Sequence, residues 1–183
     1  ARKILGIKSS KKIILVGSTN LKDFYKGFDK YLEAIKQLDK EKYFLCFFGN
    51  VDKNVVSDLG FEYKSFGYLN DNISLRLVYS CANVFVAPSL MDAFGKTIAE
   101  SMGCGTPVVC FDATGPKDIV THKVDGYKAE SFKSDDLSSG IEWILNNKNY
   151  EELCQKARNK VVGEFDSVVV AKKYIDLYEE ILK

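Results

Sequence analysis

Two carboxylates flank a short segment with the features of a helix N-terminus. Asp92 and Glu100 are separated by seven residues, and Gly95-Lys96-Thr97 lies between them. A helix beginning there would present free backbone N–H groups and the positive end of its dipole, which together favour a phosphate group. Asp92 before the helix and Glu100 about two turns along it can accept hydrogen bonds from hydroxyl groups. If each residue is considered alone, the simpler interpretation is that Asp92 complements the helix dipole and that Glu100 is a solvated helix residue.

Two common phosphate motifs do not fit the chain. Gly95-Lys96-Thr97 resembles the end of a P-loop, but Leu90 stands where that loop requires a glycine. Gly103 and Gly105 resemble part of a dinucleotide fingerprint, yet they follow a predicted helix and precede a predicted strand, which is the reverse order. Helix capping and a tight turn explain these two glycines.

The composition indicates one globular α/β domain. The chain has 183 residues, of which 46% are hydrophobic and 28% are charged, as in ordinary folded proteins. Its 26 basic and 25 acidic residues give a formal charge of +1, so we expect no nucleic-acid partner. No apolar run approaches the ~20 residues of a membrane span, and no signal-peptide core is visible, which favours a cytoplasmic protein.

The N-terminal segment and the cysteines each allow a simple interpretation. Residues 1–12 contain five basic residues and no acidic one, which would suit peripheral contact with the inner face of an anionic membrane. A solvated linker end is the simpler alternative.

The five cysteines are odd in number and show no C-x-x-C spacing, so we expect buried reduced thiols and no structural zinc. They are Cys46, Cys81, Cys104, Cys110 and Cys154.

Short apolar runs alternate with helical patterns, which is typical of a doubly wound parallel sheet. We predict strands at 12–17, 43–48, 61–66, 83–87 and 107–111. Because most of these runs are continuously apolar, both faces of the sheet should be covered. The prediction is therefore a Rossmann-like core over residues 12–130, preceded by a linker end at about 1–11 and followed by C-terminal helices over 131–183.

Helical spacing identifies the covering elements. A first helix carries apolar residues from Phe28 to Leu38, and a second follows an Asp71 cap with Ile73, Leu77 and Val78 on one face. Three more helices are predicted at about 134–147 from Ser134, 149–164, and 166–182 from Asp166. The last has a stripe of four apolar residues: Val170, Tyr174, Tyr178 and Ile181.

The segment from Pro88 to Asp118 resembles the family 4 glycosyltransferases of the GT-B fold. Their mark is an acidic residue, seven others, then Glu, followed by a Gly-x-Pro-Val-Val strand, and Asp92, Glu100 and residues 105–109 match it. The resemblance also covers Val16-Gly17, Lys26-Gly27 and Phe66-Gly67-Tyr68. It implies the C-terminal, donor-binding half of a GT-B enzyme, without the N-terminal acceptor-binding domain that would be its partner.

The resemblance implies a role for each residue toward a nucleotide-diphosphate sugar, which would be a substrate and not a cofactor. Lys26 and Asp92 would be catalytic, with Lys26 on the pyrophosphate and Asp92 on sugar hydroxyls, while Glu100 would accept both ribose hydroxyls. The side chain of Lys96 would add a charge or point to solvent. The complete donor-binding set is Gly17, Ser18, Lys26, Tyr68, Leu69, Asp92, Ala93, Phe94, Gly95, Lys96, Thr97 and Glu100.

The chain departs from the family pattern at three positions. Ser18 stands where many members have Arg, and Lys22 is a candidate replacement for that charge. Asp92 and Asp118 stand where Glu is frequent. Each shorter carboxylate would lie about one methylene further from its partner, so the sugar preference of other members cannot be transferred.

The resemblance implies a retaining hexosyltransferase acting on a saccharide or lipid-linked acceptor, in the setting of surface polysaccharide (including lipopolysaccharide) or glycolipid synthesis. No metal is expected, because the helix terminus and Lys26 would stabilise the leaving diphosphate. We interpret His122 as structural. Two alternatives stay open: a GT-B sugar-nucleotide epimerase, and a non-catalytic sugar-nucleotide-binding module. In each case we expect the isolated chain to be inactive in transfer.

Overall fold

The computed structural model describes residues 1–182, and its centre is a six-stranded parallel sheet. The strand order is β3-β2-β1-β4-β5-β6, so the direction of winding reverses between β1 and β4. This confirms the predicted Rossmann-like doubly wound sheet. The strands are β1 (Lys12–Asn20), β2 (Tyr43–Asn50), β3 (Tyr63–Ser65), β4 (Val84–Ala87), β5 (Val108–Phe111) and β6 (Tyr127–Ala129).

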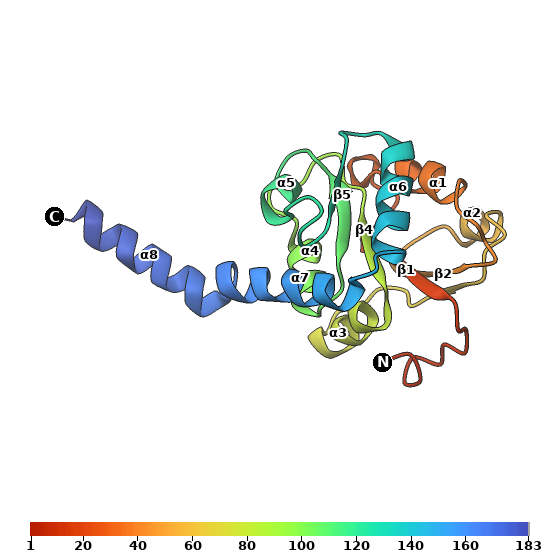
Figure 1. Ribbon diagram of the computed structural model, residues 1–183, viewed down its shortest axis with the longest axis horizontal. Coiled ribbons are helices and arrows are strands. Elements are labelled where there is room, and N and C mark those ends of the chain that lie inside the picture. Colours follow the sequence, from red (N-terminus) through yellow and green to blue (C-terminus); the bar gives the residue numbers. More distant parts are fainter. Residues whose placement is uncertain (183) are drawn as a thin grey trace.

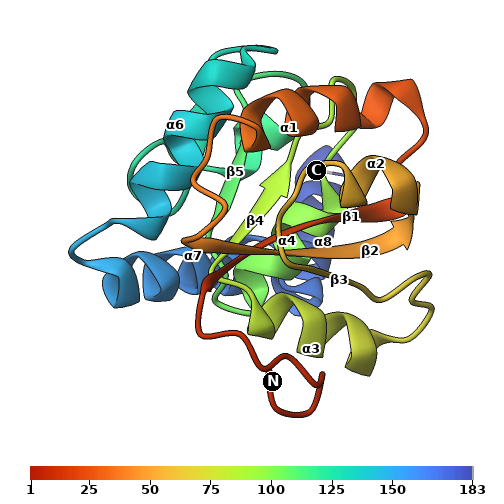
Figure 2. The same cartoon turned by 90° about the vertical axis from the view of Figure 1, so that its right-hand side faces the viewer.

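Helices cover both faces of the sheet (Figure 2). Along β1, Ile14 and Val16 belong to one buried cluster, and Ile13 and Leu15 belong to the other, as alternating side chains should. The first cluster is closed by α1 (Phe28–Ile35), α2 (Lys53–Ser57) and α6 (Ser134–Leu145). The second is closed by α3 (Asn72–Cys81), α4 (Lys96–Gly103), α5 (Pro116–Ile119) and α7 (Tyr150–Glu164).

Several boundaries differ from the predicted ones. β1 continues past Gly17 to Asn20, and the strand predicted at 61–66 is limited to Tyr63–Ser65. The sequence analysis missed β6, α2, α5 and the 3-10 helix η1 (Phe24–Lys26). These elements have only three to five residues, which is too short for a hydrophobic period to appear.

The predicted helix starts are present, with one change of role. Asp71 accepts a hydrogen bond from the Ser74 N–H at 2.8 Å, and Asp166 accepts one from the Val168 N–H at 2.9 Å, so both act as caps. Ser134 is the first residue of α6, while Lys133 stands at the N-cap without a side-chain cap hydrogen bond, and the Ser134 hydroxyl donates to Glu33 of α1. In α3 the predicted apolar face was partly wrong. Ile73 is 67% exposed, and the buried face carries Val78, Tyr79 and Cys81.

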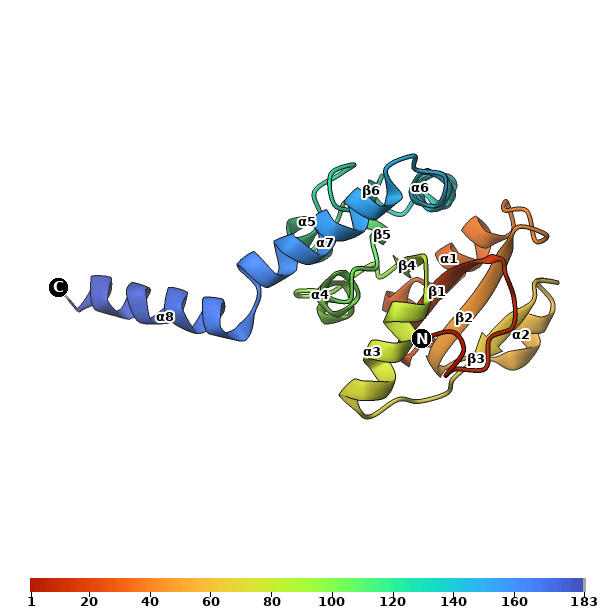
Figure 3. The same ribbon diagram turned by 60° about the horizontal axis from the view of Figure 1, so that its bottom comes forward.

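The two ends of the chain differ in how they pack. α8 (Ser167–Ile181) extends away from the sheet and contains no buried residue, so its predicted apolar stripe is present but largely exposed (Figures 1 and 3). The N-terminal segment, in contrast, contacts the domain. Arg2 donates to the Cys81 carbonyl at 3.0 Å and to the Asn83 side chain at 2.6 Å, and Ile7 is buried.

The described residues contain no disulfide bond and no helix suited to cross a membrane. Within residues 1–182 all five cysteines are free, and Cys46, Cys81 and Cys110 are buried, as predicted. Cys104 and Cys154 are half-buried. None of the helices between residues 1 and 182 has the length and apolar character needed to cross a membrane.

Candidate functional site

The loops that follow β1 and β4 meet at the point where the sheet reverses its winding. Gly27 joins them: its φ is 62°, and a Cβ atom there would lie 1.9 Å from the Pro88 carbonyl oxygen, so only glycine fits. The Leu90 N–H also donates to the Tyr25 carbonyl at 2.8 Å. These contacts place Lys26 beside Asp92, with 3.4 Å between Nζ and Oδ2.

Asp92 holds the entrance of α4 in place. Its Oδ1 accepts hydrogen bonds from the N–H groups of Phe94 and Gly95, at 3.3 and 3.0 Å, while Oδ2 pairs with Lys26. The Phe94 and Gly95 N–H groups are thus bonded to Asp92 and are not free donors for a phosphate. Within residues 1–182, the N–H groups of Lys96 and Thr97 have no protein acceptor, so they are the donors that this helix end can offer.

A second glycine supports the same loop from the other side. The Gly115 N–H donates to the Asp92 carbonyl at 2.9 Å, and a Cβ atom at Gly115 would lie 2.5 Å from the Ala93 carbonyl oxygen. Phe94 projects the other way, 43% exposed, with its ring 5.4 Å from that of Phe165. Ala93, Phe94 and Gly95 therefore shape the loop, and they do not line the cavities described next.

Two adjoining cavities lie on either side of the N-terminus of α4. One has a volume of about 290 Å³ and contains Lys26 and Asp92; the other, of about 170 Å³, contains Glu100. Both are lined by Ser18, Thr19, Lys96 and Thr97. The first is completed by Gly17, Leu21, Phe85, Ala87, Pro88 and Ser89, and the second by Phe48, Gly49, Tyr68, Leu69, Leu75 and Tyr79.

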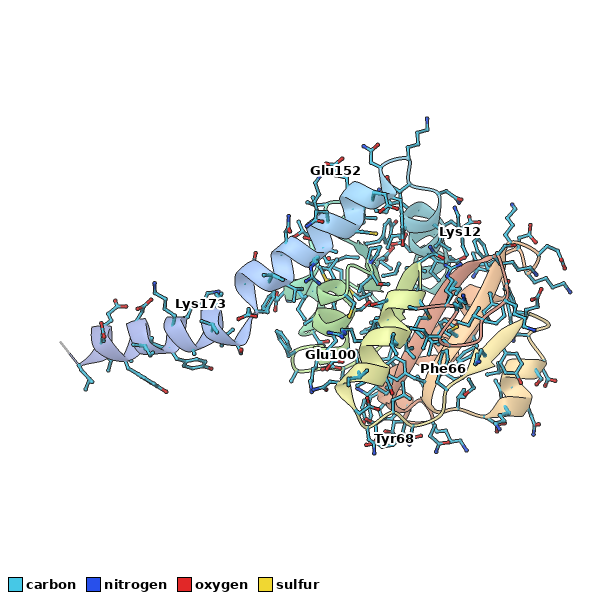
Figure 4. All side chains as sticks on the ribbon, turned by 90° about the horizontal axis from the view of Figure 1, so that it is seen from below. Lys12, Phe66, Tyr68, Glu100, Glu152 and Lys173 are labelled. Atoms are coloured by element: carbon cyan, nitrogen blue, oxygen red, sulfur yellow. The ribbon has the colours of Figure 1, made fainter. Side chains whose placement is uncertain are left out.

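Glu100 and Tyr68 lie on the same side of the domain (Figure 4). Glu100 projects from α4, with its Oε1 atom 3.5 Å from the ammonium of Lys96. The Lys96 side chain is 86% exposed, so its charge lies at the rim of the site. Tyr68 and Leu69 follow β3 and form the opposite wall of the smaller cavity.

Tyr79 is a site residue that the sequence analysis missed. Its hydroxyl donates to Glu100 Oε2 at 3.0 Å, and burial, followed by the nearby Glu100 charge, raises the pKa of this phenol. Its position in the sequence shows only helical spacing with Leu75, which is typical of a core residue. Thr19, Phe48 and Ser89 were also missed: Thr19 and Phe48 belong to no motif, and Ser89 lies in the Pro88–Asp118 segment but before the Asp92 and Glu100 pair.

Lys22 does not replace the charge expected at position 18, although Lys26 and Lys96 line the larger cavity together with Ser18. The hydroxyl of Ser18 is buried and has no hydrogen-bond partner within residues 1–182. Lys22, the candidate replacement, lines a separate cavity of about 450 Å³ together with Asp23, Asp29 and Asp52. Gly17 has a packing role, since a Cβ atom there would lie 2.2 Å from the Phe48 ring.

His122 fits the structural interpretation. Its Nδ1 accepts a hydrogen bond from the Lys128 N–H at 3.1 Å, and its ring lies 4.6 Å from that of Tyr127. It lines neither cavity. Over residues 1–182 no group of three or more His, Cys, Asp or Glu side chains is arranged to hold a metal ion.

Comparison with solved structures defines the class of the fold. The chain matches sucrose-phosphate synthase from Thermosynechococcus elongatus with a TM-score of 0.84 and 24% identity, over 99% of this chain and 48% of that one. It matches the Anabaena protein HepE, solved in complex with UDP-glucose, with a TM-score of 0.81 and 20% identity, over 98% of this chain and 51% of that one. The chain therefore has the fold of one half of a GT-B glycosyltransferase.

Residues 1–161 match the family described as glycosyl transferases group 1, and the chain belongs to that family. An uncharacterized glycosyltransferase of Methanocaldococcus jannaschii is 27% identical, over 97% of this chain and 47% of the relative. A Campylobacter jejuni N,N'-diacetylbacillosaminyl-diphospho-undecaprenol alpha-1,3-N-acetylgalactosaminyltransferase is 25% identical, over 87% and 43%. The chain spans about half the length of these curated relatives, and it is the donor-binding half.

Proposed function

We propose that this chain binds the nucleotide-diphosphate sugar of a retaining hexosyltransferase. The observation that carries the proposal is the pair of adjoining cavities separated by the N-terminus of α4. The larger cavity is lined by Lys26 and Asp92, and the smaller one by Glu100. The free N–H groups of Lys96 and Thr97 lie between them. A diphosphate at the helix end would then have a sugar on one side and a nucleoside on the other.

Each part of the donor has matching chemistry. Lys26 and the N–H groups of Lys96 and Thr97 would stabilise the negative charge that develops on the leaving diphosphate. Asp92 would accept hydrogen bonds from sugar hydroxyls, and Glu100 from the ribose hydroxyls. Backbone groups of Tyr68 and Leu69 would meet the base. None of these contacts calls on a metal ion.

The acceptor and the base are proposed from relatives. The Campylobacter jejuni relative is named for transfer to an undecaprenol-linked sugar, and the Anabaena structure contains UDP-glucose. We therefore place the complete enzyme in transfer of a hexose from a uridine-diphosphate sugar to a saccharide or lipid-linked acceptor, as in surface polysaccharide or glycolipid synthesis. The acceptor-binding domain would supply the other wall of the cleft, so the isolated chain should bind donor without transferring it.

Thermal-shift measurements with a panel of nucleotide-diphosphate sugars, the bare nucleoside diphosphates and the free sugars test this proposal. A ligand at about 100 times its dissociation constant stabilises the fold by about 2.7 kcal/mol, which is several degrees. We expect a shift for one base with and without sugar, and none with free sugar. Absence of any shift with every nucleotide would overturn the proposal.

A matched pair of variants locates the effect. Glu100→Ala removes a helical glutamate that is paired with Lys96, and Glu152→Ala removes one paired with Lys156 on α7, away from the cavities (Figure 4). Only Glu100→Ala should reduce the shift. Equal losses in both variants would show that the shift does not report on the proposed site.

A further inference from the structure

Tyr79 lies between the core and the smaller cavity, and its ring packs against two phenylalanine rings. It is 1% exposed, and its ring meets those of Phe48 and Phe85 edge-on, with centroids 5.6 and 5.4 Å away. Buried tyrosine hydroxyls are usually hydrogen-bonded, and the partner of Tyr79 is Glu100 Oε2 at 3.0 Å. The core therefore anchors one end of this hydrogen bond.

The two helices that carry this pair are joined by a buried polar network. The Thr106 hydroxyl donates to the Tyr79 carbonyl at 2.8 Å, and the Ser101 hydroxyl donates to the Thr106 carbonyl at 3.0 Å. The Thr106 N–H in turn donates to the Ser101 carbonyl at 3.0 Å. Since Ser101 follows Glu100 directly in α4, the backbones of Tyr79 and Glu100 keep a fixed separation.

The hydroxyl of Tyr79 limits what the carboxylate of Glu100 can do. A free glutamate samples several rotamers, and ordering such a side chain on binding costs conformational entropy. With Oε2 held by Tyr79, the carboxylate keeps one orientation and still offers further lone pairs on both oxygens. Because burial and the charge of Glu100 raise the pKa of the phenol, Tyr79 remains a donor at neutral pH.

We propose that Tyr79 is a positioning residue that orients the Glu100 carboxylate toward the two ribose hydroxyls and so makes the site selective for ribonucleotides over 2′-deoxyribonucleotides. This inference rests on the proposed function, because it takes Glu100 as the ribose contact. Tyr79 itself does not touch the ligand in this proposal. Its contribution is to remove the ordering cost from binding, which is the general effect of preorganisation.

Tyr79→Phe deletes the hydroxyl and keeps the packed ring. The probes are UDP, GDP and ADP with their 2′-deoxy counterparts, titrated into the chain by calorimetry. For the base that binds the wild-type chain, we expect Tyr79→Phe to weaken ribonucleotide binding about three- to tenfold, the size of one hydrogen bond, and to weaken deoxy-ligand binding by a smaller factor, because that ligand keeps only its 3′-hydroxyl contact with Glu100. The ratio of the two dissociation constants should shrink accordingly.

Tyr150→Phe is the matched control. The Tyr150 hydroxyl donates to the Asn83 carbonyl at 2.8 Å, and burial likewise raises the pKa of this phenol, but it lines neither cavity. This variant should lose stability without changing the ratio. Since the ratio compares two ligands on one sample, partial unfolding alters both affinities alike and does not mimic the expected result.

Glu100→Ala separates the two possible failures. In that background Tyr79→Phe should have no further effect on binding, because there is no carboxylate left to orient. A wild-type chain that binds no nucleoside diphosphate contradicts the proposed function. Suppose that the chain binds a nucleoside diphosphate and that Glu100→Ala weakens this binding. If Tyr79→Phe then leaves the ratio of the ribo and deoxy dissociation constants unchanged, or shifts it equally in the Glu100→Ala background, only the role of Tyr79 is refuted.

Discussion

The ion pair between Lys26 and Asp92 leads to a prediction of opposite sign for two ligands at one position. Asp92 neutralises the lysine that is proposed to bind the diphosphate. Asp92→Asn removes that negative charge, yet its amide oxygen can still accept the hydrogen bonds from the Phe94 and Gly95 N–H groups. The helix entrance should therefore stay intact while Lys26 becomes free for the diphosphate.

The size of the effect follows from the geometry. At 3.4 Å the attraction between the two charges is about 1 kcal/mol in water and about 5 kcal/mol at the effective dielectric constant near a protein surface. Both side chains are 24% exposed, and such pairs keep a net value of about 1 kcal/mol. Nucleoside diphosphate binding should thus tighten about fivefold. For the nucleotide sugar, loss of a charged acceptor worth about 1.5 to 3 kcal/mol outweighs that gain, so its affinity should fall.

Calorimetry with both ligands at low and high salt is the assay. The gain for the nucleoside diphosphate should diminish toward 1 M salt, where the screening length falls to about 3 Å. Asp166→Asn is the control, since it removes the same charge from another helix cap, at α8. Weaker binding of the nucleoside diphosphate to Asp92→Asn than to the wild type, with an unchanged melting temperature, would refute the reasoning.

Three further predictions concern the same site. Lys26→Ala should weaken nucleoside diphosphate binding by about 1.5 to 3 kcal/mol and barely change nucleoside binding; equal losses by calorimetry would remove Lys26 from the phosphate site. Ser18→Arg should strengthen diphosphate binding, because Ser18 lines both cavities whereas Lys22 lines neither. Unchanged affinity would mean that position 18 does not face the phosphate. Glu100→Gln should weaken binding of the nucleoside diphosphate and the nucleotide sugar alike, by about 1 to 3 kcal/mol. If the variant instead unfolds in a thermal melt while its folded fraction binds with normal affinity, the role of Glu100 is to stabilise the fold and not to bind the ligand.

Features that depend on residues within one short segment, such as buried strands and helix caps, could be predicted from the sequence. The apolar runs of β1 and β2 predicted a doubly covered sheet because burial on both faces removes the usual alternation of polar and apolar residues. Asp71 and Asp166 predicted helix starts because a cap bonds to an N–H only two or three residues away. The spacing of Asp92 and Glu100 likewise placed Asp92 before α4 and Glu100 within it, because both positions are set by one short segment.

Contacts between distant segments followed only from the tertiary structure. Tyr79 and Glu100, 21 residues apart, meet because α3 and α4 pack on one face of the sheet, and nothing in the sequence around Tyr79 distinguishes it from a core residue. Lys26 and Asp92, 66 residues apart, meet because their loops leave neighbouring strands at the point of reversed winding. Spacing along the chain was therefore enough to place residues along α4, whereas the residues that share a cavity depend on the strand order of the sheet, which no local spacing encodes.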